Sequence, residues 1–312
     1  MRSPLPFSLD HINCYLIHDG EGWAVVDTGM KGRKAIEQWK AVIADALDGL
    51  PITRVISTHH HPDHIGLAGW FCDSFKVPFY TSEAEYFYTR AFHGPKRKEG
   101  YWETINYFNL TNMRQSSRDA LLGDNNYHQM VWDVPSAFHR LQDGDHFAIG
   151  DTIWEVITTR GHAPEHVSLY CESLGLLISG DQVLPEITSN VSITSTQAYA
   201  DPLQDWFDAH NKIREQVPDG AMVLPAHQLP FRGLHERLDE VVAHHHERLD
   251  RIITLCTAPK DPQTLTDELF NKEMDAFQNF LAVGECMAHV NWLLARGKLT
   301  RDTVDGQWRL SA

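Results

Sequence analysis

Short apolar runs separated by polar turns fill most of the first 235 residues, a pattern typical of β-strands with at least one buried face. Residues 12–29 hold two such runs around an Asp-Gly-Glu-Gly turn, which predicts a hairpin. Further strands are predicted at 52–58, 151–159, 166–172, 174–181 and 221–227. Apolar residues at helical spacing over 33–47 and 203–217 predict helices between them. The alternation indicates the α/β class.

Two segments depart from this alternation. Residues 83–138 are rich in helix formers and aromatic rings and lack strand alternation, which predicts a helical insertion. From residue 236 onward, helical patterns at 236–256, 265–277 and 284–297 precede a hairpin pattern at 298–310 that turns at Asp305-Gly306. We therefore expect a main domain at 1–235, which carries the insertion, and a helical, winged-helix-like C-terminal domain at 236–312.

Composition and charge narrow the class of partner. Of 312 residues, 42% are hydrophobic and 22% charged, as in an ordinary folded protein. The net charge of −15 disfavours broad attraction to nucleic acid or to anionic membranes. Residues 236–312 carry 9 Lys and Arg against 13 Asp and Glu, the wrong sign for DNA binding. We expect a small-molecule substrate and neither nucleic acid nor membrane as a partner, and a homo-oligomer stays open.

Cysteine usage and the N-terminal segment bear on location. The five cysteines are odd in number, scattered and free of CxxC pairs, which suits reduced thiols. No long apolar run follows the basic start, and no stretch approaches the ~20 apolar residues that span a bilayer. These features favour a cytoplasmic protein.

The stretch STHHHPDHIG at 57–66 is the strongest chemical signal. Alternate side chains of an extended segment face the same way, so His59 and His61 can converge while His60 points elsewhere. Asp63 and His64, beyond the proline, can face a second ion. Because two ligands do not hold an ion, further ligands must come from other segments.

Three more candidate ligands follow predicted strands. His162, Asp181 and His227 each stand where a strand pattern gives way to a loop, the usual place for chemistry on a rigid scaffold. Imidazole and carboxylate together suit zinc, iron or manganese.

The complete set carries a family resemblance. The seven residues, in chain order, are His59, His61, Asp63, His64, His162, Asp181 and His227. This series resembles the dinuclear metal signature of the metallo-β-lactamase superfamily, particularly its hydroxyacylglutathione-hydrolase-like branch. The segment VVDTG at 25–29 resembles the early motif of the superfamily, in which Asp27 would orient a ligand. The tail resembles the C-terminal helical domain of the β-lactamase-like protein 2 family, whose members include hydrolases and ribonucleases.

The resemblance implies an αββα sandwich with the metal site at one edge of its two sheets. His59, His61 and His162 would hold one ion, Asp63, His64 and His227 the other, and Asp181 would bridge them. Antibiotic β-lactamases of the superfamily commonly have Cys or no ligand at the position of Asp181. A carboxylate there instead suits the thioesterase, lactonase and phosphodiesterase branches.

The implied chemistry is hydrolysis with two divalent ions per chain, which we expect to be zinc, with iron or manganese open. Two such ions share a water and present it as a bridging hydroxide. Asp63 is the candidate catalytic acceptor of a proton. We expect a small ester, thioester or lactone as substrate. The alternatives are a metal-dependent phosphodiesterase or ribonuclease and a non-catalytic metal-binding ligand sensor.

Other polar and aromatic clusters receive more modest interpretations. We expect His60, Glu165 and His166 to support the site rather than act in it. His244, His245 and His246 cannot share one helix face, which predicts a solvated face. The rings of 83–138 would pack as core or line an acyl or aryl pocket. Lys96, Arg97 and Lys98 predict a solvated turn or a clamp for an anionic group.

Overall fold

A computed structural model describes residues 1–5, 10–92, 100–123 and 127–312 of the chain. The basic segment around Lys96 lies outside these residues. The chain forms two compact units: the first comprises Met1–Gly94, Asn126–Ser189 and Lys212–Arg237, and the second Pro95–Asn125, Asn190–Asn211 and Leu238–Ala312. The second unit thus gathers two internal segments with the C-terminal residues. The domain boundary that we expect at residue 235 stays a prediction.

The first sheet of the first unit is mostly parallel. Its strands are, in spatial order, β3 (Tyr15–His18), β4 (Trp23–Val26), β5 (Ile52–Ile56), β6 (Phe79–Thr81) and β7 (His139–Arg140). The predicted hairpin is confirmed, because β3 and β4 pair antiparallel from Tyr15–Val26 to His18–Trp23. The other pairs are parallel, with α1 (Arg33–Ala46) between β4 and β5 and α3 (Ala68–Phe75) between β5 and β6.

The second sheet contains the remaining predicted strands. Its order is β12 (Met222–Pro225), β11 (Leu176–Gly180), β10 (His166–Cys171), β9 (Thr152–Thr159) and β8 (His146–Ile149). Only the β11–β12 pair is parallel, while β10 runs opposite to both β9 and β11. Strands β9, β11 and β12 therefore all end at the same edge of the sheet.

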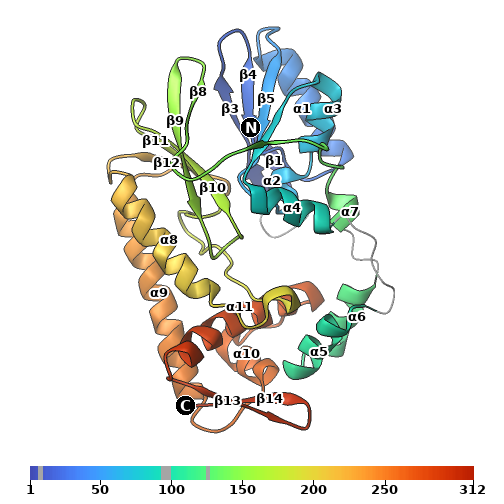
Figure 1. The fold of residues 1–312 in the computed structure, drawn as a ribbon, viewed down its shortest axis with the longest axis vertical. Coiled ribbons are helices and arrows are strands. Elements are labelled where there is room, and N and C mark those ends of the chain that lie inside the picture. The colour runs from blue at the N-terminus through green and yellow to red at the C-terminus, as the bar shows by residue number, and fades with distance from the viewer. Residues whose placement is uncertain (6–9, 93–99, 124–126) are drawn as a thin grey trace. The chain divides into compact units, whose positions relative to one another are not determined.

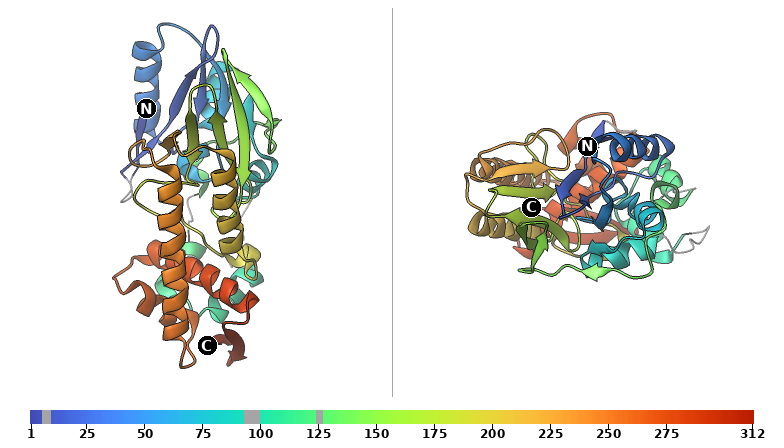
Figure 2. Two further views of the ribbon diagram at one scale, coloured as in Figure 1. Left: turned by 90° about the vertical axis from the view of Figure 1, so that its left-hand side faces the viewer. Right: turned by 90° about the horizontal axis from the view of Figure 1, so that it is seen from above.

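Side-chain alternation along the strands builds the layers (Figures 1 and 2). Because successive residues of a strand face opposite sides, Val25 packs with the residues of α1 and α3, whereas Ala24 and Val26 pack with the second sheet. Trp39 of α1, fully buried, and Trp154 of β9, 1% exposed, are among the largest side chains of these two cores. The layered α/β sandwich that the resemblance implies is confirmed. A short pair, β1 (Arg2–Pro4) with β2 (His11–Asn13), precedes it.

The predicted insertion is helical. It holds α4 (Glu83–Phe92), α5 (Trp102–Leu110), α6 (Gln115–Leu122) and α7 (Tyr127–Met130). Its rings divide between core and surface: Tyr107 and Phe108 are 2% exposed, whereas Phe87 and Trp102 are 55% and 71% exposed.

The second unit is helical, with a terminal hairpin. It contains η1 (Ser195–Gln197), α10 (Pro262–Phe270), α11 (Ala276–Ala295), β13 (Thr300–Val304) and β14 (Gln307–Ser311), and shares α8 (Pro202–Gln216) and α9 (Leu234–Leu255) with the first unit. The hairpin turns at Asp305 and Gly306, both with positive φ. Within the described chain, no helix combines the length and apolar character needed to cross a membrane.

Two details of this unit differ from the sequence expectations. The helical pattern at 265–277 is interrupted, because Asn271 ends α10 in a left-handed conformation and Asp275 begins α11 with a capping box. The expected solvated face at 244–246 is wrong for His245, which is fully buried. Its ring packs on Trp206 of α8, 4.4 Å between centroids, so the helix turns this one histidine toward the core.

Candidate metal centre

The predicted ligands lie just past strands, as expected, except that two of them stand inside a short helix. His59 and His61 follow β5, Asp63 and His64 lie in α2 (Pro62–Ile65), and His162, Asp181 and His227 follow β9, β11 and β12. Since these three strands end at the same edge of their sheet, the segments that follow them come together there. Gly66 allows the turn after α2 to close, because a Cβ at this position would lie 2.2 Å from the carbonyl oxygen of Pro62.

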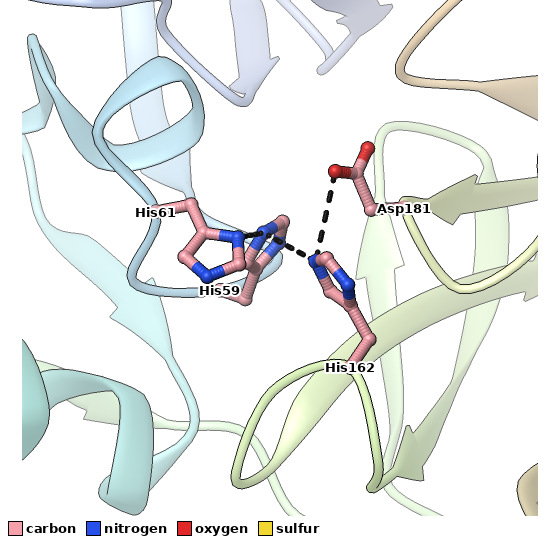
Figure 3. Close-up of side chains that lie close together, drawn as sticks. All are labelled: His59, His61, His162 and Asp181. Atoms are coloured by element: carbon pink, nitrogen blue, oxygen red, sulfur yellow. Dashed lines mark hydrogen bonds and ion pairs between the residues drawn. The ribbon is translucent and has the colours of Figure 1, made fainter. Parts of the chain in front are cut away.

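The first group of side chains comprises His59, His61, His162 and Asp181 (Figure 3). His59 Nε2 lies 2.8 Å from His61 Nδ1 and 3.2 Å from His162 Nε2. Asp181 Oδ2 lies 3.6 Å from His162 Nε2. One candidate ligand atom from each residue falls within 4.8 Å of all the others, a spacing that could hold a metal ion.

The second group comprises Asp63, His64 and His227. His227 Nε2 lies 3.3 Å from Asp63 Oδ2, and His64 Nε2 lies 3.7 Å from the same oxygen. Asp181 Oδ1 lies 3.4 Å from each of these two imidazole nitrogens. The two oxygens of Asp181 thus face different groups of histidines, the arrangement required of a bridging ligand.

Buried polar atoms show that the residues fit metal ions. Among the described residues, His64 Nε2 and Asp181 Oδ1 are buried without a hydrogen-bond partner. Such groups are costly unless something else satisfies them. The carboxylates of Asp27 and Asp181, 2% and 8% exposed, add buried negative charge that calls for a cation.

The pKa shifts follow from burial and charge. Burial and neighbouring imidazoles hold the pKa of His59 and His61 well below the usual range, so both rings stay neutral and keep a lone pair. Burial opposes protonation of His227 too, but Asp181 and Asp63 outweigh it and raise its pKa to about 10. The pKa of His64 is likewise raised well above its usual range. Protons on His64 and His227 therefore supply positive charge beside the carboxylates, and a bound metal ion would supply this charge in their place.

Asp27 orients two of the histidines, as its place in the VVDTG motif predicts. Its Oδ2 lies 2.8 Å from His64 Nδ1, and its Oδ1 accepts the Thr58 N–H at 2.8 Å. The Thr58 hydroxyl lies 3.0 Å from His59 Nδ1. Asp27 adopts φ 56°, a left-handed conformation that aspartate tolerates better than most residues.

Further supports could not be read from the motif. His227 Nδ1 lies 2.9 Å from the carbonyl oxygen of His11, and the amide of Asn13 donates to the carbonyl oxygens of Pro225 and Gln228. His166 accepts the backbone N–H of Asp181 at Nε2, 3.2 Å away, and so steadies the bridging candidate. Of these supporting residues, the sequence predicted only His166. A hydrogen bond to a backbone carbonyl oxygen depends on no particular residue type, so it leaves no signal in the sequence.

The fold and this site together define the class of protein. The chain belongs to the metallo-β-lactamase superfamily, whose family model matches residues 8–227. A second model, for the metallo-β-lactamase-like C-terminal domain, matches residues 249–312. Both matches confirm the resemblance drawn from the sequence, and the chain is a hydrolase of this superfamily.

Individual relatives cover the whole chain or most of it. The crystal structure of a β-lactamase domain protein from Burkholderia ambifaria is 35% identical, with TM-score 0.92 over 100% of this chain and 91% of that chain. A probable metallo-hydrolase of Bacillus subtilis, YqjP, is 23% identical over 96% of this chain and 93% of its own length. An atrochrysone carboxyl ACP thioesterase of Aspergillus fumigatus is 22% identical over 79% of this chain and 44% of its own.

Proposed function

We propose that the protein is a dinuclear metal hydrolase that cleaves a small ester, thioester or lactone. His59, His61 and His162 would hold one divalent ion, Asp63, His64 and His227 the other, with Asp181 shared. Zinc is the proposed metal, with iron and manganese as alternatives, because all seven side chains offer nitrogen or carboxylate oxygen ligands that suit these three metals. The observation that carries this proposal is the position of Asp181, whose oxygens lie 3.4 Å from His64 and His227 on one side and 3.6 Å from His162 on the other.

The chemistry divides between the ions and the side chains. When bound, divalent ions supply Lewis acidity that lowers the pKa of a water and polarises the scissile carbonyl. The chain's own task is to fix the donors: Asp27 and Thr58 hold His64 and His59, and the His11 carbonyl holds His227. Asp63 is proposed to accept the proton of the attacking water, because its carboxylate lies 3.3 Å from His227 Nε2 within the second group.

A carbonyl substrate is favoured over a phosphodiester. The net charge of −15 repels a polyanionic chain. The fungal relative is named as a thioesterase, which supports acyl chemistry on this arrangement. We therefore propose a small-molecule substrate. We also propose that the enzyme is cytoplasmic and that its cysteines are reduced.

The test is a hydrolysis panel of acyl thioesters, aryl esters, lactones and bis-aryl phosphodiesters, run with the metal-analysed protein. We expect metal-dependent turnover of carbonyl substrates alone. Asp181→Ala should lower turnover more than ~100-fold and reduce bound metal, since it removes a ligand of both ions. Asp151→Ala, an exposed carboxylate, is the matched control.

Other outcomes of the panel would redirect the proposal. Selective phosphodiester cleavage would establish the nuclease alternative, and two bound ions without any hydrolysis would establish the sensor. Full activity in Asp181→Ala would show that the bridging assignment is wrong.

A further inference from the structure

Glu85 is a fully buried carboxylate that belongs to neither group of candidate ligands. It lies in the first turn of α4, where the helix dipole favours negative charge. Three donors from two different loops meet its oxygens. Because a buried carboxylate is costly unless it is fully paired, this position must gain its stability from those donors.

The first loop that Glu85 contacts is the histidine-rich loop after β5. Glu85 Oε2 accepts the backbone N–H of His60 at 2.9 Å and lies 2.5 Å from His60 Nδ1. His60 stands between His59 and His61, so a bond to its backbone fixes the segment that carries both of these candidate ligands. The side chain of His60 turns away from the metal groups to make this contact, which accounts for the one imidazole of the HHH run that is not a candidate ligand.

The second loop that Glu85 contacts carries His162. Glu85 Oε1 accepts the backbone N–H of Glu165 at 2.7 Å. The same loop also accepts two hydrogen bonds from the start of α4. The side chain of Glu165 accepts the N–H of Ala84 at 2.9 Å, and the carbonyl oxygen of Glu165 accepts the Ser82 hydroxyl at 2.6 Å. The start of α4 and the loop between β9 and β10 therefore hold each other through three hydrogen bonds, each of which joins a side chain to a backbone group.

We propose that Glu85 is a positioning residue that sets the distance between His59, His61 and His162, and so the affinity of the first ion. One carboxylate joins the two loops that supply all three histidines of the first group. The second group draws Asp63 and His64 from α2 and His227 from the loop after β12. Asp27 contacts His64, and the His11 carbonyl contacts His227. Loss of Glu85 should therefore weaken one ion and spare the other. This inference rests on the proposed dinuclear site.

The experiment is a stepwise titration of the metal-free full-length protein with Co²⁺, followed by visible absorption and by competition with a chelator. Glu85→Gln keeps the size of the side chain, but its amide nitrogen faces a donor and cannot accept from it. We expect one of two dissociation constants to rise about 10–100-fold, the range for lost partners of metal ligands, with a changed absorption band for that ion. The other constant should stay at the wild-type value.

Two further variants make the test specific. Glu83→Gln alters a neighbouring carboxylate of the same helix, 47% exposed and 2.8 Å from Arg140, and should leave both constants unchanged. His60→Ala removes only the side-chain bond and retains the backbone N–H, so about two ions per chain should still bind, with a smaller loss for the same ion. This variant serves as the test if Glu85→Gln does not fold, as judged by circular dichroism.

The outcomes separate this inference from the proposed function. Unchanged constants in a folded Glu85→Gln, or an equal loss for both ions, would overturn the positioning role. A wild-type chain that binds two ions but hydrolyses nothing would overturn the proposed activity alone. A wild-type chain that binds no Co²⁺ would overturn the metal site and this inference together.

Discussion

Among the residues that the structure describes, each of the two units has a cluster of buried histidines, and the two clusters differ in what surrounds the rings. In the first unit, His59 and His64 are fully buried and lie near the carboxylates of Asp27 and Asp181. In the second unit, His245 Nδ1 lies 2.9 Å from His289 Nε2, and His289 Nδ1 donates to the carbonyl oxygen of Glu285.

The difference in charge decides what each cluster can do. Burial lowers the pKa of His245 to about 2 and that of His289 to about 4, so both are neutral at pH 7. The nearby carboxylate of Glu285 is paired with Arg248. The neutral rings of the second cluster, of which His245 packs on Trp206, form part of the core. The rings of the first cluster lie beside two buried carboxylates, whose negative charge favours a cation. Burial of histidine alone therefore does not mark a metal site.

Removing one histidine from each cluster tests most directly whether only the first cluster binds metal. His227→Ala should abolish binding of one ion and lower turnover more than ~100-fold, because a direct ligand is lost. His289→Ala should retain about two ions per chain. Metal analysis of the two folded variants checks this, and loss of metal from His289→Ala would contradict the division.

A smaller effect should follow from weakening a support rather than a ligand. One carboxylate oxygen of Asp27 meets the Thr58 N–H and the other meets His64. Asp27→Asn replaces one of these oxygens with an NH₂ group that cannot accept, which should weaken metal binding about 10–100-fold. Chelator competition measures this loss. Asp45→Asn, an exposed carboxylate of α1, should bind metal like the wild type.

A separate effect concerns pH and the second cluster. The ordinary pKa of histidine is about 6.5, so between pH 6.5 and about 4 the unfolded chain takes up protons at His245 and His289 that the folded chain does not. Their contribution to stability is full above pH 6.5 and falls by about 1.4 kcal/mol per pH unit for each histidine as the pH drops.

Urea denaturation of metal-free protein at several pH values measures this dependence. His245→Asn should have a shallower pH slope than the wild type, because one such group is gone. His246→Asn should keep the wild-type slope, since His246 is exposed in the folded chain. Equal slopes in all three proteins would contradict the buried, neutral state of His245.

Local sequence patterns predicted the strands that precede the site, several helices and the identity of the seven clustered residues. Strand periodicity and glycine turns are local properties, so the hairpin at 12–29 and the strands before His162, Asp181 and His227 could be read directly. Polar residues just past those strands were candidate ligands, and the family resemblance implied that they converge, as the geometry shows.

The tertiary structure was needed to show what the supporting and core histidines contact. His60 and His245 each lie inside an HHH run. Strand alternation set His60 apart from His59 and His61, but nothing local indicated that His245 is buried. Glu85 meets His60 from 25 residues away, and Trp206 meets His245 from α8. Such contacts depend on how distant segments pack, because burial and pairing of a polar group are set by all the elements around it and not by its own stretch of chain.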